Sequence, residues 1–189
     1  KAKITDAIMS HYLSTNKFPE GRKIGQAIGA VDKWSLVGEF ENISASGFSK
    51  DFGALAHPEP SHKFKNKFGA EVNWFRYDRL RNDLWLDFEY IFNTDESIIY
   101  AQTFCESPDK REVQLRLGTS GSYKIWLNDV LVSQAEEERN NDFDTYIFKA
   151  TLNKGNNRIL IQIGSSEIEN SNLLLRITDS DGYPLSLIH

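Results

Sequence analysis

The sequence predicts an all-β protein, an antiparallel β-sandwich preceded by a short N-terminal helical segment. Apolar residues have helical spacing over residues 1–31, and the spacing changes to two at Trp34. About nine alternating stretches follow, as expected of an antiparallel sandwich. Residues that tolerate positive φ stand between several of them, as hairpin turns require. We therefore divide the chain into a helical lead-in, residues 1–31, and a β-sandwich domain, residues 32–189.

The helical lead-in is predicted to contain two helices. Their apolar residues recur at intervals of three or four: Ile4, Ile8 and Tyr12 in the first, and Ile24, Ile28 and Val31 after Pro19 in the second. Gly25 and Gly29 each cost the second helix about 1 kcal/mol relative to alanine. A short helix with this cost persists only when it packs against other structure.

The strands are predicted from alternating apolar and polar residues. The stretches are 34–40, 72–75, 84–90, 100–105, 113–117, 123–127, 146–152, 159–163 and 173–177. Turn residues separate several of them, at 118–121, 128–129, 153–156 and 179–182. The region from 40 to 67 shows no clear alternation and is rich in Gly, Ser, Pro and Lys, which predicts a long loop. Long loops in compact domains are often functional.

Composition excludes some classes of partner. The chain has 22 basic and 27 acidic residues, a net charge of −5, so we expect no nucleic-acid partner. No apolar run approaches the roughly 20 residues that span a bilayer. The chain begins at Lys1 rather than methionine, and we expect it to be part of a longer protein. A single cysteine, Cys105, excludes an internal disulfide framework without fixing the compartment.

Two groups of motifs resemble known β-sandwich families. The stretch 27–42, followed by Gly47-Phe48 and Pro58-Glu59, resembles the opening of certain bacterial modules, W-x-x-x-G-P-F-D-N, G-F-D and P-P-E. Those modules are usually embedded in large exported chains with tetratricopeptide or transglutaminase-like parts. The stretches 115–128 and 152–163 are similar to L-x-x-G-S-D-G-x-x-K-V-W-L-N-G and L-x-x-G-x-N-x-L-L-V-K-V of galactose-binding-like jelly rolls. A protective-antigen-type sandwich is the second resemblance.

These resemblances imply a fold and a class of function. They imply a galactose-binding-like jelly roll, which in glycosidases is a non-catalytic accessory domain. They therefore imply binding or scaffolding rather than turnover, and a periplasmic or extracellular location. Fold similarity alone names no ligand.

No catalytic or metal-binding residue is assigned from the sequence. Cys105 lies in an alternating strand without a neighbouring base, which predicts a buried structural thiol. His57 and His62 stand five residues apart, a spacing that matches no common zinc pattern, and we expect them to be surface-loop histidines. No paired carboxylates with a hydrolytic arrangement are legible. We expect the protein not to be an enzyme and to need no cofactor.

The candidate ligand-binding residues are Trp74, Tyr77, Asp142 and Asp144. Exposed aromatic rings stack on the apolar faces of sugars, and Trp74 and Tyr77 stand near the long loop. Asp142 and Asp144 belong to an acidic loop that is expected to be a solvated connection. Calcium, which takes carboxylate oxygens, is the alternative for this loop. We expect Trp74, Tyr77 and the loop from Glu136 to Asp144 to share one rim, while Trp34 and Trp126 pack inside.

Three hypotheses for function follow. The first is a non-catalytic accessory binding module of a larger exported protein, with a glycan as its ligand. The second is a structural module that docks neighbouring domains of a longer chain through the N-terminal helices. The third is a hydrolase. It ranks lowest, because the sequence shows no catalytic triad, no metal-ligand spacing and no tuned carboxylate pair.

Overall fold

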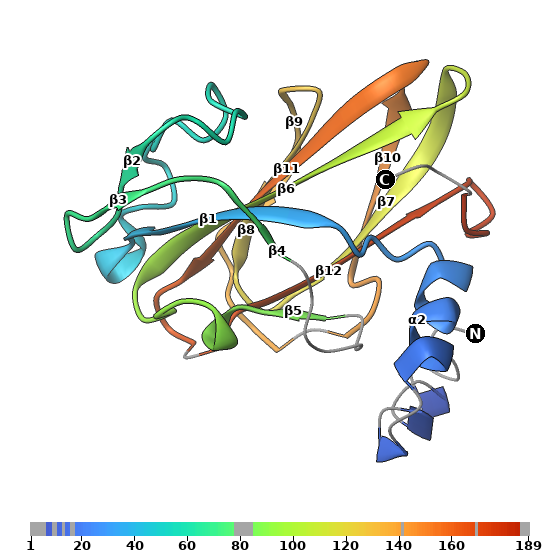
Figure 1. Cartoon of the computed structure of the whole chain (residues 1–189), viewed down its shortest axis with the longest axis horizontal. Coiled ribbons are helices and arrows are strands. Elements are labelled where there is room, and N and C mark those ends of the chain that lie inside the picture. Colours follow the sequence, from blue (N-terminus) through green and yellow to red (C-terminus); the bar gives the residue numbers. More distant parts are fainter. Residues whose placement is uncertain are drawn as a thin grey trace.

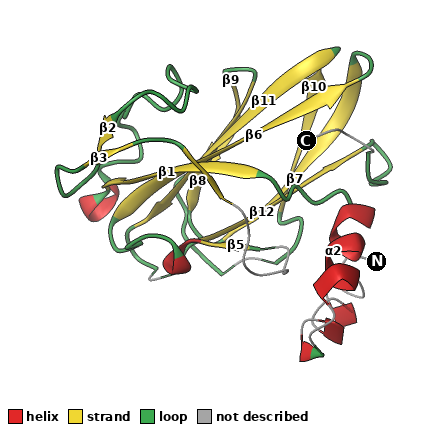
Figure 2. Ribbon diagram, in the orientation of Figure 1, coloured by secondary structure: helices red, strands yellow, loops and turns green. Residues whose placement is uncertain are grey.

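The protein is an antiparallel β-sandwich of two sheets (Figure 1). The structure is a computed structural model and describes residues 7–8, 11–12, 14–15, 18–77, 85–140, 142–168 and 170–185. Strands dominate the described chain, with one labelled helix beside the sandwich (Figure 2). The predicted all-β fold is confirmed.

The elements follow one another from α2 to β12. They are α2 (Phe18–Ala27), β1 (Trp34–Glu41), β2 (Phe64–Lys65), β3 (Glu71–Val72), β4 (Phe75–Tyr77), β5 (Leu86–Asp87), β6 (Ser97–Ser107), β7 (Arg111–Thr119), β8 (Ser122–Leu127), β9 (Val130–Ala135), β10 (Tyr146–Leu152), β11 (Gly155–Ser165) and β12 (Asn172–Thr178). Two short 3₁₀ helices, Ile43–Ala45 and Phe88–Tyr90, lie in the connections.

The order of the strands gives the sandwich its jelly-roll connectivity. One sheet has the order β4-β1-β6-β11-β8-β9 and the other β10-β7-β12-β5. After β6 the chain changes sheet at every connection except the β8–β9 hairpin. All strand pairs are antiparallel, and β6 and β11 pair over their full length, from Gly155 opposite Ser107 to Ser165 opposite Ser97. The predicted jelly roll is confirmed.

Alternation along the strands fills the main core between the two sheets. The core includes Ile99 and Ala101 on β6 and Leu115 and Leu117 on β7, all completely buried. Cys105 lies in the same core at 1% exposure, so the prediction of a structural thiol is confirmed. Burial raises the pKa of this thiol to about 11, which keeps it protonated and unreactive.

A second apolar cluster lies on the outer face of the six-stranded sheet. Its sheet side includes Val37, Ile98 and Tyr100, and its cover comes from the long segment between β1 and β4, through Phe64 and Trp74. This segment is mostly loop, as predicted, but it also contains the small β2–β3 hairpin. In Figure 1 this hairpin and α2 lie on opposite sides of the sandwich. The loop thus forms a third layer over one sheet.

Helix α2 docks on the other sheet, through the residues that follow it. Val31 N–H donates to the Leu175 carbonyl, and the Gly29 carbonyl accepts from Ile177 N–H. Gly29 has φ +79°, and a side chain there would meet the Ile177 oxygen at 2.6 Å, so glycine ends this helix. The predicted second helix is confirmed for 18–27, although it ends before Ile28. The first predicted helix lies mainly outside the described residues.

Two predicted strands differ from the structure. In the described part of the stretch 84–90, only β5 is a strand, because Phe88 N–H bonds to the Ser171 carbonyl and the chain then turns into a 3₁₀ helix. The stretch 72–75 divides into β3 and β4. Strand β9 was not predicted, since its first residues do not alternate in burial: Val130 is 69% and Leu131 46% exposed.

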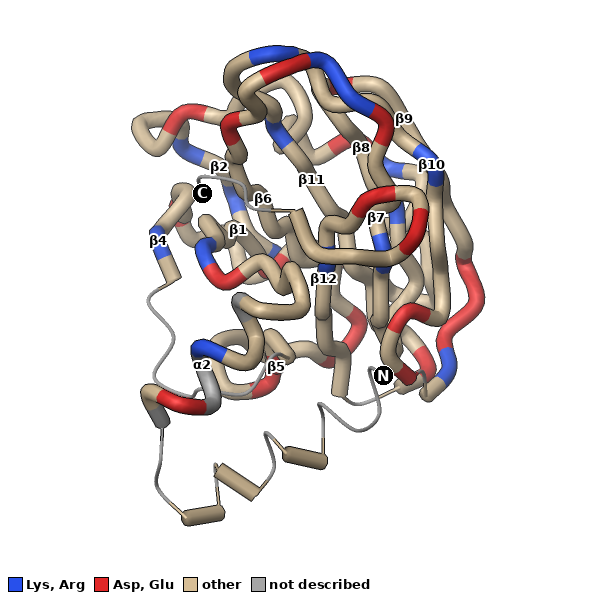
Figure 3. Tube along the Cα trace, turned by 90° about the vertical axis from the view of Figure 1, so that its right-hand side faces the viewer, with Lys and Arg blue, Asp and Glu red and all other residues tan. Residues whose placement is uncertain are grey.

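The surface carries charges of both signs. Lys and Arg residues are interspersed with Asp and Glu residues along the trace in Figure 3. This pattern agrees with the small net charge of −5. Among the described residues, no helix has the length and apolar character needed to cross a membrane.

Candidate functional site

The structure places the predicted stacking residue Trp74 in the interior. Its side chain is only 2% exposed, packs in the second apolar cluster and donates Nε1–H to the His57 carbonyl at 2.7 Å. Tyr77 is half-buried and packs against the main core opposite Trp34. The prediction that Trp74 offers an exposed platform is therefore corrected: this ring anchors the loop. Trp34 and Trp126 pack in the two clusters, as predicted.

The predicted ligand residue Asp144 forms ion pairs inside the protein. Its Oδ2 accepts from Arg176 at 2.5 Å and from Arg116 at 3.2 Å, and its side chain is only 14% exposed. Asp142 is exposed, and its carboxylate caps its neighbour, the Phe143 N–H, at 2.9 Å. Both guanidinium groups contact Oδ2, so this oxygen is already paired with cations, whereas the buried Oδ1 has no hydrogen-bond partner among the described residues.

The predicted rim residues lie on opposite sides of the sandwich. Arg116 and Arg176 alternate with core leucines and so face outward from the four-stranded sheet, where they hold Asp144. Trp74 covers the outer face of the six-stranded sheet. Trp74 and Asp144 are therefore not adjacent, because both sheets lie between them, whereas the acidic loop itself runs from β9 of the six-stranded sheet to β10 of the four-stranded sheet.

A hollow of about 370 Å³ lies beside β4, where four segments of the chain meet. Its lining comes from β1, the β2–β3 hairpin, β4 and the turn after the 3₁₀ helix 88–90: Gly38, Glu39, Asn66, Glu71, Val72, Asn73, Phe75, Ile91, Phe92 and Asn93. The Phe75 and Phe92 rings lie 5.9 Å apart at 54°, and Phe75 is 40% exposed. This volume lies within the range of small-molecule sites.

The polar side chains of this hollow are held in place. Glu39 Oε2 accepts the Asn93 N–H at 2.5 Å, and Glu71 Oε2 pairs with Lys63 Nζ at 2.7 Å. The hydrogen bond and charge of Lys63 lower the pKa of Glu71, so this carboxylate is ionised at neutral pH. The hollow therefore combines an apolar ring face with amide and carboxylate groups.

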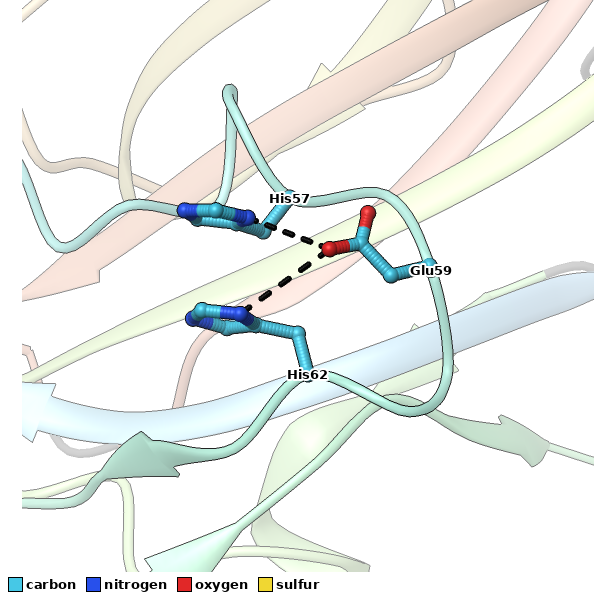
Figure 4. Close-up of side chains that lie close together, drawn as sticks. All are labelled: His57, Glu59 and His62. Atoms are coloured by element: carbon cyan, nitrogen blue, oxygen red, sulfur yellow. Dashed lines mark hydrogen bonds and ion pairs between the residues drawn. The ribbon is translucent and has the colours of Figure 1, made fainter.

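A group of titratable side chains, His57, Glu59 and His62, lies in the loop over the six-stranded sheet (Figure 4). The two imidazole rings stack with their centroids 3.6 Å apart and an interplanar angle of 5°. Glu59 Oε1 lies 3.1 Å from His57 Nδ1 and 3.9 Å from His62 Nδ1. A hydrogen bond from its own backbone, followed by that from His57, lowers the pKa of Glu59.

The two histidines lie on the surface, as predicted, but the sequence did not show that they meet. Their side chains are 42% and 32% exposed. The spacing of five across Pro58 and Pro60 fits no helix or strand period, so sequence periodicity could not bring the rings together. A proline-shaped turn brings them together instead, and the run His-Pro-Glu-Pro-Ser-His is the signal that could have revealed it.

Comparison with known proteins identifies neither a family nor a curated relative: no family model and no curated protein matches the sequence. Among solved structures, similarity extends to an uncultured Clostridium sp. β-glucuronidase, with 14% identity over 80% of this chain and 29% of that chain and a TM-score of 0.43. A Kluyveromyces marxianus β-glucosidase shares 14% identity over 82% of this chain and 16% of that one, with a TM-score of 0.41.

A third similar structure is a family 35 carbohydrate binding module from Clostridium thermocellum. It shares 18% identity over 46% of this chain and 73% of that one, with a TM-score of 0.30. This chain spans less than a third of either glycosidase. At these TM-scores the similarities carry no argument about ligand or activity.

Proposed function

We propose that this protein is a non-catalytic binding module for carbohydrate, and that it serves as an accessory part of a larger exported protein. The observation that carries the proposal is the hollow beside β4, where Phe75 and Phe92 meet Glu39, Asn73 and Asn93. The resemblance of its sequence motifs to galactose-binding-like modules of exported bacterial chains supports the accessory role and a periplasmic or extracellular location.

The chemistry of this hollow suits a sugar ring. The axial C–H groups of a pyranose are apolar and pack on an aromatic face, whereas its hydroxyl groups need planar polar partners. Phe75 supplies the exposed face, the side-chain oxygen of Asn73 supplies an acceptor, and the amide nitrogen of Asn93 supplies a donor. The Glu39 carboxylate adds an acceptor for hydroxyl groups. Because the site is shallow and open, its affinity is expected to be weak.

The carboxylates of the hollow support binding rather than catalysis. A glycosidase needs one protonated carboxyl group as general acid beside an ionised one. Glu71 is ionised through its pair with Lys63, and Glu39 is engaged by the Asn93 N–H. The lowered pKa of Glu71 is the opposite of what a general acid requires.

The purified protein is expected to show no hydrolysis of a panel of aryl glycosides, aryl esters and peptide substrates. The reason is that Cys105 is buried with a raised pKa, and Glu71 of the hollow is ionised through Lys63 rather than protonated as a general acid would be. Release of the chromophore over hours at micromolar protein measures this. Reproducible turnover that is lost in Glu39→Gln or Glu71→Gln would contradict the proposal.

Glycan binding is expected in the range on the order of micromolar to millimolar Kd. A glycan array identifies the binding sugars, and calorimetry with the best of them gives Kd. Phe75→Ala removes the exposed ring of the hollow, and we expect it to weaken binding about tenfold, equivalent to about 1.4 kcal/mol. Circular dichroism checks that the variant remains folded.

Phe68→Ala is the matched control. Phe68 is 65% exposed, follows β2 in the same loop layer and does not line the hollow. Its removal should leave Kd unchanged. The carbohydrate proposal fails if no glycan binds, or if Phe75→Ala and Phe68→Ala behave alike.

Interdomain docking is the second candidate function, and one observation favours it. Ile24, Ile28 and Ala30 pack around Leu174 on the outer face of the four-stranded sheet. The N-terminal segment therefore already uses this face as a docking surface. Absence of glycan binding would favour this function.

A further inference from the structure

We propose that His57, Glu59 and His62 form a binding site for a divalent transition-metal ion, with Zn²⁺ as the representative ion. This proposal does not depend on carbohydrate binding. One ligand atom from each of the three side chains lies within 4.8 Å of the other two. Two imidazoles and a carboxylate are a ligand set that binds Zn²⁺ in proteins.

The distances are close to those that a bound ion requires. Zinc binds nitrogen and oxygen at about 2.0–2.2 Å, so two ligand atoms in a tetrahedral site lie about 3.3 Å apart. His57 Nδ1 and Glu59 Oε1 are already 3.1 Å apart, whereas His62 Nδ1 is 3.9 Å from the same oxygen. Figure 4 shows both Nδ1 atoms on the side of the rings that faces Glu59. The stacked rings must splay by rotation about their side-chain bonds to direct both lone pairs at one ion.

The backbone of this turn is held by three side-chain hydrogen bonds from two neighbouring segments. Trp74 Nε1 donates to the His57 carbonyl, Gln102 Nε2 to the Pro58 carbonyl at 2.9 Å, and Asn73 Nδ2 to the Pro60 carbonyl at 3.2 Å. Within the turn, the His57 N–H donates to the Gly53 carbonyl at 3.0 Å and the His62 N–H to the Glu59 carbonyl at 3.2 Å.

These anchors reduce the entropy that metal binding must overcome. Pro58 and Pro60 fix φ at two further positions of the turn and restrict the residues that precede them, His57 and Glu59. The metal therefore meets side chains on an ordered backbone and has only their rotamers to fix.

The cluster is open to solvent, which gives an ion both access and free coordination positions. The side chains of His57, Glu59 and His62 are 42%, 46% and 32% exposed. Three protein ligands leave the fourth tetrahedral position to water or to an external ligand. The ion would also link two ends of the turn over the Trp74 anchor, so it should stabilise this loop layer.

Binding is tested with Zn²⁺ and Co²⁺ salts on the full chain without an affinity tag. Calorimetry with Zn²⁺ is expected to give one site per chain. Co²⁺ is expected to give visible d–d absorption, which reports protein ligands around the ion. His57→Ala and His62→Ala should each weaken Zn²⁺ binding by at least about tenfold, because loss of an outer-shell partner alone costs about 10–100-fold. Glu59→Gln keeps the shape of the side chain and should also weaken binding.

His11→Ala is the matched control, because His11 is an exposed histidine in the N-terminal segment, outside the cluster. It should leave Zn²⁺ affinity and the Co²⁺ spectrum unchanged. Ca²⁺, which prefers a shell of oxygen ligands, should not compete for the site. Circular dichroism in the absence of metal confirms that each variant is folded.

Three results would overturn the proposal. These are no Zn²⁺ binding at millimolar concentration, binding that is unchanged in both histidine variants, and binding that is lost equally in His11→Ala. The carbohydrate proposal is judged separately, because its variant, Phe75→Ala, leaves all three proposed metal ligands in place.

Discussion

Replacement of Asp144 by alanine is expected to destabilise the protein by about 3–5 kcal/mol, the usual cost of removing one partner from a buried ion pair. Asp144 Oδ2 accepts from both Arg116 and Arg176, whose side chains are only 18% and 7% exposed. Without the carboxylate, two guanidinium groups remain close together with little solvent to separate their charges. Arg176 also donates Nε–H to the Ile28 carbonyl at 2.9 Å, so the loss should loosen the docking of the N-terminal segment.

Denaturant unfolding with a constant m-value measures this loss, and a fall in Tm of about 10 °C should accompany it. Asp144 has φ +54°, a conformation that Asn tolerates better than Ala. Asp144→Asn therefore separates the effect of the charge from that of the backbone strain. We expect it to lose less stability than Asp144→Ala but more than a surface substitution. Asp142→Asn changes an exposed carboxylate of the same loop and should cost less than about 0.5 kcal/mol. A loss below about 1 kcal/mol in Asp144→Ala would show that the two arginines do not need this partner.

The regular part of the sandwich could be predicted because burial there depends on one alternating pattern. Along β11, Ile159, Ile161 and Ile163 point into the main core, and the sequence shows that period directly. In 84–90 the apolar residues also alternate, yet Phe88 is buried from a 3₁₀ turn rather than a strand. Alternation reports which residues are buried, but a turn can bury the same residues when a distant carbonyl, here that of Ser171, captures the backbone.

The candidate sites could be predicted only in part, because they depend on contacts between segments far apart in the sequence. Trp74 was predicted to be an exposed stacking residue near the long loop. It does contact that loop, but as a buried anchor, since its indole N–H bonds to the carbonyl of His57, 17 residues away. Asp144 lies in an acidic run, and nothing local reveals the arginines of β7 and β12 that neutralise it. The hollow beside β4 needs four segments, so no single motif could indicate it.

The long loop over the six-stranded sheet depends on one residue in particular, Arg158 of β11. Its side chain is 9% exposed and donates to the carbonyls of Ala54 and Leu55, both at 2.8 Å. It also donates Nε–H to Gln102 at 3.0 Å and pairs with Asp129 at 3.0 Å. Desolvation by burial lowers the pKa of this guanidinium, although arginine stays charged at any physiological pH. A single side chain therefore satisfies the loop backbone and fixes it to the sheet.

Arg158→Met is expected to cost at least about 3 kcal/mol, because two loop carbonyls and the Gln102 amide lose buried partners at about 1–3 kcal/mol each. The methionine keeps apolar contact with the sheet, so the loss reports hydrogen bonds more than packing. Arg158→Lys keeps the charge but not the planar fork of donors. It should therefore retain only a part of the stability that Arg158→Met loses. Arg139→Met is the control, because Arg139 is 51% exposed and its ion pair with Glu137 should contribute about 0–1 kcal/mol. Hydrogen exchange should show the largest loss of protection at Gly53–Trp74, ahead of the main core, and equal loss in both regions would show that Arg158 supports the whole fold rather than this loop.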